Sequence, residues 1–134
     1  MLQLNDREFE FVSNELTMTL ECLGDSLQMR ENQGVDGYKV GEYTDWARRQ
    51  DDLFELQDEL SAGENFLCFH SLGFLYRVVE EALNVGQQFL TEDYDEAEKE
   101  LIKLDNTMLE NLLLRVEQEY EADFQEYAIP LKRR

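Results

Sequence analysis

Apolar residues recur at steps of three and four along much of the chain, which is the spacing of one face of an α-helix. The clearest series lies between residues 6 and 30. It follows Asn5 and Glu8, whose types and spacing match a helix-capping box. The series predicts an amphipathic first helix, and its apolar members are Phe9, Val12, Leu16, Leu20, Leu23 and Leu27.

Glycine marks the first interruption of this pattern. Residues 33–43 carry three glycines within eight positions, which predicts a loop, or a short hairpin through Tyr38, Val40 and Tyr43. We expect Thr44 or Asp45 to cap a second helix that ends near Gly63. The apolar side of this helix carries Trp46, Leu53, Leu56 and Leu60.

The second half of the chain predicts further helices. Residues 64–89 are apolar nearly all round in their first half, which is typical of a helix in the middle of a bundle. We expect Asp93, with Glu96, to cap the next helix and Pro130 to stop it. Its apolar stripe is Ala97, Leu101, Leu104, Met108, Leu109, Leu112, Val116, Tyr120, Phe124 and Tyr127.

The sequence leaves the continuity of this last segment open. Either one helix runs from 94 to 127, or it breaks near Asp105, where Thr107 and Glu110 offer a second capping box. The prediction as a whole is an all-α fold, a bundle of four to five helices with antiparallel packing. Residues 1–134 are long enough to bury one ordinary core, so we expect a single acidic helical domain.

Charge changes this picture from a generic bundle to an unusual one. The 134 residues include 31 acids and 12 bases, which gives a formal charge of −19. Such a protein repels nucleic acid and anionic membrane surfaces and attracts basic proteins. We therefore expect no direct nucleic-acid binding and no membrane binding.

The remaining features favour a cytoplasmic location. The most apolar segment, Phe66–Val79, is too short and too polar to span a bilayer, and the first residues do not resemble a signal peptide. Cys22 and Cys68 lie in apolar helical patterns, where cysteine is typically a small core residue. Reduced cysteines fit a reducing compartment.

Catalytic and metal-binding patterns are missing from the sequence. His70 is the single histidine and lies in an apolar stretch, so we expect it in the core. One histidine cannot supply the two Glu-x-x-His motifs of a di-iron bundle. A structural zinc site is not expected either, because the sequence has no second Cys/His pair. The sequence contains no nucleophile elbow, phosphate-binding loop or dinucleotide fingerprint. We expect no enzyme, no cofactor and no specific metal.

Two runs of carboxylates are the candidate binding surface. Together they hold eleven of the 31 acids and include a single base, Lys99, so they lack the Glu-to-Lys pairs that stabilise ordinary exposed helices. The first run is Glu92, Asp93, Asp95, Glu96, Glu98 and Glu100. The second run is Glu117, Glu119, Glu121, Asp123 and Glu126. If the last helix is continuous, the two run centres lie about 39 Å apart, close to the 34–36 Å of one DNA turn.

Two functional hypotheses follow. The first is a nucleic-acid mimic that blocks the basic groove of a DNA- or RNA-binding protein. By analogy of composition, this is the kind of inhibitor that phages encode against host defence, such as anti-restriction and anti-CRISPR proteins. The alternative is a helical adaptor, chaperone or immunity protein that binds its partner through an apolar or aromatic groove. A homodimer through the C-terminal stripe is compatible with both.

Overall fold

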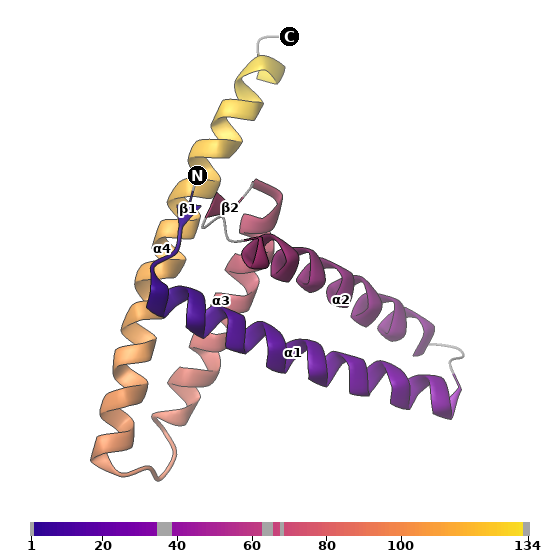
Figure 1. Cartoon of the computed structure of the whole chain (residues 1–134), viewed down its shortest axis with the longest axis vertical. Helices are drawn as coiled ribbons and strands as arrows, with labels where there is room; N and C mark the ends of the chain where they lie inside the picture. The colour runs from indigo at the N-terminus through magenta and orange to yellow at the C-terminus, as the bar shows by residue number, and fades with distance from the viewer. Residues whose placement is uncertain (1, 35–38, 63–65, 68, 133–134) are drawn as a thin grey trace.

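The structure is a computed structural model that describes residues 2–34, 39–62, 66–67 and 69–132. Its elements are, in order, β1 (Leu2–Gln3), α1 (Asp6–Gln33), α2 (Lys39–Ser61), β2 (Phe66–Leu67), α3 (Phe69–Phe89) and α4 (Glu96–Lys132). Four helices account for nearly all of the described chain, so the predicted all-α class is confirmed (Figure 1).

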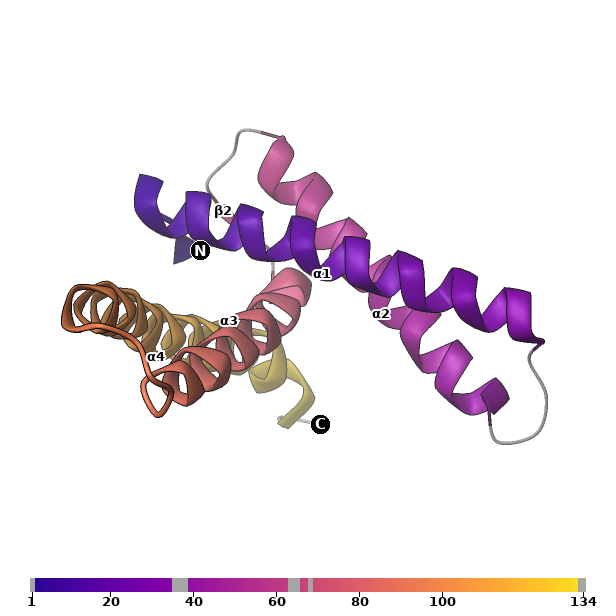
Figure 2. The same ribbon diagram turned by 90° about the horizontal axis from the view of Figure 1, so that it is seen from below.

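The helices form two antiparallel hairpins that cross each other. α1 lies beside α2 and α3 beside α4, and the far ends of the two hairpins diverge (Figures 1 and 2). The accessible surface is 9019 Å², whereas a compact protein of 15.9 kDa exposes about 7,400 Å². The excess follows from the crossing, because each hairpin packs against the other over only part of its length.

One apolar core lies where the hairpins cross. All four helices contribute to it, and most of its members are leucine or valine. β1 closes one end, since Leu2 pairs with Leu67 in the antiparallel β1–β2 ladder and both side chains are buried. The fully buried side chains of the helices include Val12, Leu16, Leu56, Leu72, Leu75, Val79, Leu109, Leu112 and Val116.

A charged contact joins the start of α1 to the middle of α4. The predicted capping box is confirmed: Asn5 Oδ1 accepts from the Glu8 amide at 2.9 Å, and Glu8 Oε1 accepts from the Asn5 amide at 3.0 Å. Glu8 is only 2 % exposed, and Arg115 Nη1 donates to both of its carboxylate oxygens at 2.6 and 2.8 Å. The carboxylate therefore serves the helix cap and the ion pair together.

The predicted start of the second helix is wrong. α2 begins at Lys39, so Val40 and Tyr43 lie in a helix rather than in a hairpin, and Tyr38 lies outside the described residues. The Thr44 hydroxyl donates to the Val40 carbonyl at 2.8 Å, an i→i−4 contact within the helix, so Thr44 is not a cap. Gly41 misled the prediction, because a glycine weakens a helix by about 1 kcal/mol without forbidding it.

The last helix does not break near Asp105, because α4 is continuous from Glu96 to Lys132. Asp95 caps it in place of the predicted Asp93, since Asp95 Oδ1 accepts from the Glu98 amide at 2.8 Å. Thr107 does not start a new helix, and its hydroxyl donates to the Lys103 carbonyl at 3.0 Å. The backbone stays helical across this segment.

Three further sequence predictions need correction. The third helix begins at Phe69 rather than at residue 64, because Phe66–Leu67 pair with β1. α4 runs two residues past Pro130 rather than ending before it, and Pro130 lies in the last turn, where little helix remains for a proline to disrupt. Cys22 is exposed rather than buried, and Cys68 lies outside the described residues.

The predicted apolar stripe of α4 is right in its middle and wrong at its start. Leu109, Leu112 and Val116 are buried, but Leu101 is 64 % and Leu104 is 54 % exposed. The inward face of α4 is the same along the helix, because Ile102, Asn106, Leu109 and Val116 follow one another at steps of four, three and seven residues. Leu101 and Leu104 lie to one side of this face, so Ile102 and Asn106 occupy the positions nearest the core in the first turns.

Candidate partner-binding surface

The first acidic run lies at the tip of the α3–α4 hairpin. It covers the connection after α3 and the first turn of α4, and all six side chains are exposed. Asp95 is the N-cap of α4, and Glu96 and Glu98 lie in its first turn. Carboxylates are favourable at a helix N-terminus, so this run also has a purely structural use.

The second acidic run lies much farther along α4 and has no such use. Glu117 and Glu121 are exposed and Glu119 is partly buried, while the side chains of Asp123 and Glu126 lie outside the described part of the chain. The Tyr76 hydroxyl of α3 donates to Glu117 at 3.0 Å, and this hydrogen bond raises the pKa of Tyr76. Acids in the second half of a helix gain nothing from the helix dipole.

The structure connects the two runs through one face of α4. Glu96, Glu110 and Glu117 are separated by multiples of seven residues, which return to nearly the same side of a helix. We call the exposed carboxylates on this face the acidic row: Glu96, Glu100, Glu110, Glu117 and Glu121. By helix rise the row is about 38 Å long. Lys103 lies within it and pairs with Glu100 at 3.7 Å.

Glu110 is the member that sequence reasoning missed. It stands outside both runs, so a search for dense charge passes over it. Its seven-residue spacing to Glu117 is the signal that could have identified it. Conversely, the structure places Asp93 and Asp95 off the row, at the end of the hairpin.

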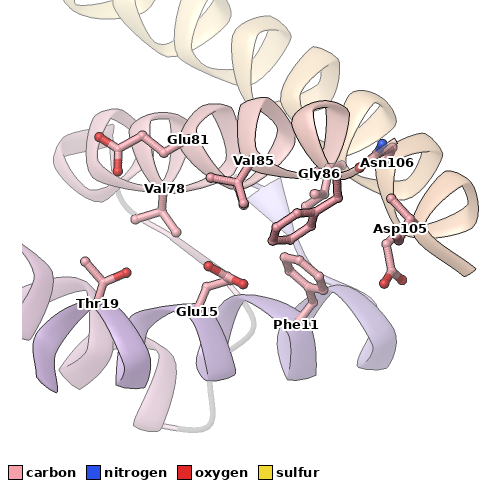
Figure 3. A pocket seen from close by; sticks show the side chains of 13 residues that line it. Phe11, Glu15, Thr19, Val78, Glu81, Val85, Gly86, Asp105 and Asn106 are labelled. Carbon is pink, nitrogen blue, oxygen red and sulfur yellow. The ribbon is translucent and has the colours of Figure 1, made fainter. Parts of the chain in front are cut away.

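A pocket of about 350 Å³ opens between the two hairpins (Figure 3). Phe11, Glu15 and Thr19 line it from successive turns of α1. α3 contributes Val85 among other apolar side chains, and α4 forms the third wall. In Figure 3 the Phe11 ring and the Glu15 carboxylate point from α1 toward α3.

The acids around this pocket differ in their partners. Glu81 pairs with Arg49 at 2.5 Å and with Arg77 at 3.2 Å, and Asp105 pairs with Arg7 at 2.9 Å. Glu15 forms no ion pair or hydrogen bond within the described residues. Partial burial raises the pKa of the Glu15 carboxyl.

One wall of the pocket contains an unusually close contact between α3 and α4. Asn106 is 6 % exposed, and its Nδ2 has no hydrogen-bond acceptor among the described residues. Its Oδ1 lies so near Gly86 that a Cβ at that position would be 2.1 Å away. A side chain at position 86 would therefore have to displace the Asn106 side chain.

Other kinds of site find no support in the described residues. In that part of the chain no group of three or more His, Cys, Asp or Glu side chains is arranged to hold a metal ion. No helix there is both long and apolar enough to cross a membrane. The side chain of His70 lies outside the described part, so its predicted place in the core stays a prediction.

Comparison with known proteins adds no relative: no family model, curated protein or solved structure matches this chain.

Proposed function

We propose that this protein is an acidic inhibitor that mimics nucleic acid and occupies the basic groove of a DNA- or RNA-binding protein. The observation that carries the proposal is the acidic row, an exposed line of carboxylates on one face of a continuous helix. Inhibitors of this chemistry are typical of phage proteins directed against host defence, and an anti-restriction or anti-CRISPR role is the corresponding biological setting.

The dimensions of the row fit this role. Carboxylates three or four residues apart on a helix stand about 5–6 Å from one another, comparable to the spacing of phosphates along a strand. The row is about 38 Å long, and one turn of DNA is about 34–36 Å. A groove that binds one turn of duplex would therefore meet a pair of carboxylates near each end of the row and Glu110 between the pairs, with Lys103 beside the first pair.

The net charge supports the same partner. A charge of −19 attracts a basic protein over long distances, which gives fast and salt-sensitive association. The second run adds weight because its position, far from the N-terminus of α4, gives its acids no favourable interaction with the helix dipole.

The test is a pull-down with three matched baits. The wild-type bait is compared with Glu100→Lys/Glu110→Lys/Glu121→Lys, which spares the helix cap and the Tyr76 contact. The control, Glu10→Lys/Glu21→Lys/Asp25→Lys, reverses three exposed acids of α1. Each triple variant adds six charges to −19 and so has the same net charge, −13. Circular dichroism first establishes that all three baits are equally helical.

We expect the wild-type and control baits to retain one nucleic-acid-binding protein. The row variant should not retain it. Added duplex DNA or RNA should release that protein, and so should salt well above the physiological range. Equal retention by the row variant, or a partner that nucleic acid does not displace, would overturn the proposal.

A helical adaptor is the second candidate, and the exposed leucines of α4 favour it. Leu101 and Leu104 lie one turn apart on a face that α3 does not cover, and apolar surface of this kind suits a partner helix. In the same assay, Leu101→Ser/Leu104→Ser should abolish capture by an adaptor and leave a mimic unaffected. An adaptor complex should also survive high salt.

A further inference from the structure

We propose that the pocket between the hairpins, lined by Phe11, Glu15 and Val85, binds one arginine side chain presented by a basic partner protein. This is a second contact, on a different face from the acidic row. It rests on the proposed function only in that the partner is a basic protein.

The walls of the pocket suit the stem and the plane of an arginine. Val85 is 45 % and Phe89 is 38 % exposed, and both line the pocket with Phe11. Aliphatic walls cover the methylene stem of a long cationic side chain. A guanidinium group stacks on a phenylalanine ring more readily than a lysine ammonium does. A volume of about 350 Å³ is small for a drug-sized ligand but ample for one side chain.

Within the part of the chain that the structure describes, one uncompensated carboxylate gives the pocket its preference for a cation. Of the three carboxylates that line it, Glu81 and Asp105 are already engaged by arginines of this chain. Glu15 is the carboxylate left without such a partner in the described residues, and Figure 3 shows it between α1 and α3. A guanidinium can pair with it in two-pronged geometry, which is stronger than a single contact.

A simple metal ion suits the pocket less well than a guanidinium group does. A metal ion would find one spare carboxylate, Glu15, among the described residues, which is too few ligands for a divalent site. A guanidinium group needs only that one carboxylate, because its two oxygens can accept two parallel N–H bonds.

The experiment uses the full-length protein and blocked pentapeptides that carry one central residue among glycines and serines. The central residue is arginine, lysine or uncharged citrulline. Binding is followed by nuclear magnetic resonance at roughly physiological ionic strength, which screens diffuse attraction to the acidic surface. We expect the arginine peptide to shift signals of Phe11, Val85 and Phe89, the lysine peptide to bind more weakly, and the citrulline peptide to have no effect.

Matched variants decide whether the pocket is responsible. Glu15→Gln should weaken binding of the arginine peptide about tenfold or more. Val85→Trp, which fills the exposed mouth, should abolish it. Glu21→Gln removes an exposed acid of the same helix and should change nothing. Unchanged binding by Glu15→Gln and Val85→Trp, or shifts spread along the acidic row, would overturn the inference.

The two proposals fail separately in these assays. Reversal of Glu100, Glu110 and Glu121 leaves the pocket intact, so that variant should still bind the arginine peptide. If the pocket binds arginine but the row is dispensable for capture of a partner, the mimic is wrong and the pocket stands. If the row captures a partner and the pocket is inert toward arginine, the reverse holds.

Discussion

The two hairpins have the same topology but are held together by different forces. α3 is the most apolar helix, and it packs against α4 through buried residues along most of its length. The buried leucines of α2 lie in its second half, near the crossing. At the far end, Arg30 pairs with Glu42 at 2.8 Å and lies 5.4 Å from the ring centre of Trp46.

This difference predicts a gradient of stability across the molecule. Exposed ion pairs and cation–π contacts contribute up to about 1 kcal/mol each, less than a buried leucine. The far end of α1–α2 should therefore open locally before the α3–α4 hairpin does. The acidic row lies on the better supported hairpin, where its carboxylates keep a fixed spacing.

The largest expected effect compares one leucine from each hairpin. Leu112→Ala removes a fully buried side chain of α4 and should cost about 2–5 kcal/mol of unfolding free energy. Leu27→Ala in α1 should cost clearly less, because Leu27 lies outside the main core cluster. Urea denaturation of both variants measures the difference, and equal losses would contradict the gradient.

The next effect concerns the contact that joins the hairpins. Arg115→Leu leaves the buried Glu8 carboxylate without its cation and should lower the unfolding free energy by about 2–3 kcal/mol. Adding Glu8→Gln should recover part of this loss, since glutamine keeps the capping contact without the buried charge. Thermal denaturation of the single and double variants checks this, and a double variant no more stable than the single one would count against it.

A third comparison uses one glycine from each hairpin. Gly86→Ala should destabilise by about 1–3 kcal/mol, because the new Cβ would meet Asn106. Gly24→Ala on α1 should instead stabilise by about 0.5–1 kcal/mol, since its nearest neighbour is 3.9 Å away. Denaturation midpoints that move in opposite directions confirm the close contact of α3 and α4. Midpoints that move together refute it.

The smallest expected effect is a pH dependence of the unfolding free energy that comes from Glu15, between the two hairpins. Burial raises the pKa of Glu15 above its ordinary 4.5, so the folded state holds this proton more tightly than the unfolded state. Stability from this group is therefore greatest below pH 4.5 and falls as the pH rises through the raised pKa.

Glu15→Gln should for that reason be slightly more stable than wild type at pH 7, and the difference should close at acidic pH. Unfolding curves of both proteins, recorded from pH 7 down to acidic pH, measure this difference in stability. Glu21→Gln is the control for the loss of one charge from the same helix, and an identical pH profile for both variants would contradict the effect of burial.

The sequence predicted the helices better than their ends. The spacing of Val12, Leu16 and Leu20 is strong because a helix buries the same face at every turn. The start of α2 was wrong because Gly41 is a weak breaker that contacts with α1 override. The start of α4 shifted from Asp93 to Asp95 because several carboxylates in that run could cap a helix.

The candidate surfaces depended on information that the sequence does not contain. The acidic row needs a continuous α4 and a known inward face, and the exposed Leu101 shows that apolar spacing alone gives the wrong face. The pocket needs the crossing of the hairpins, which brings Phe11 and Val85 together from distant positions. Burial of Glu8 could not be foreseen, because its cation lies 107 residues away.

That separation also sets the order in which the chain can mature during synthesis. At about 5–20 residues per second, a ribosome needs roughly 5–20 s to extend the chain from Glu8 to Arg115. Until then the newly synthesised α1 lacks Arg115, the cation that pairs with Glu8 in its first turn. Leu2 and Leu4, which are buried in the folded protein, also lack part of the surface that buries them. We therefore expect the α1–α2 hairpin to reach its full stability only after α4 has been synthesised.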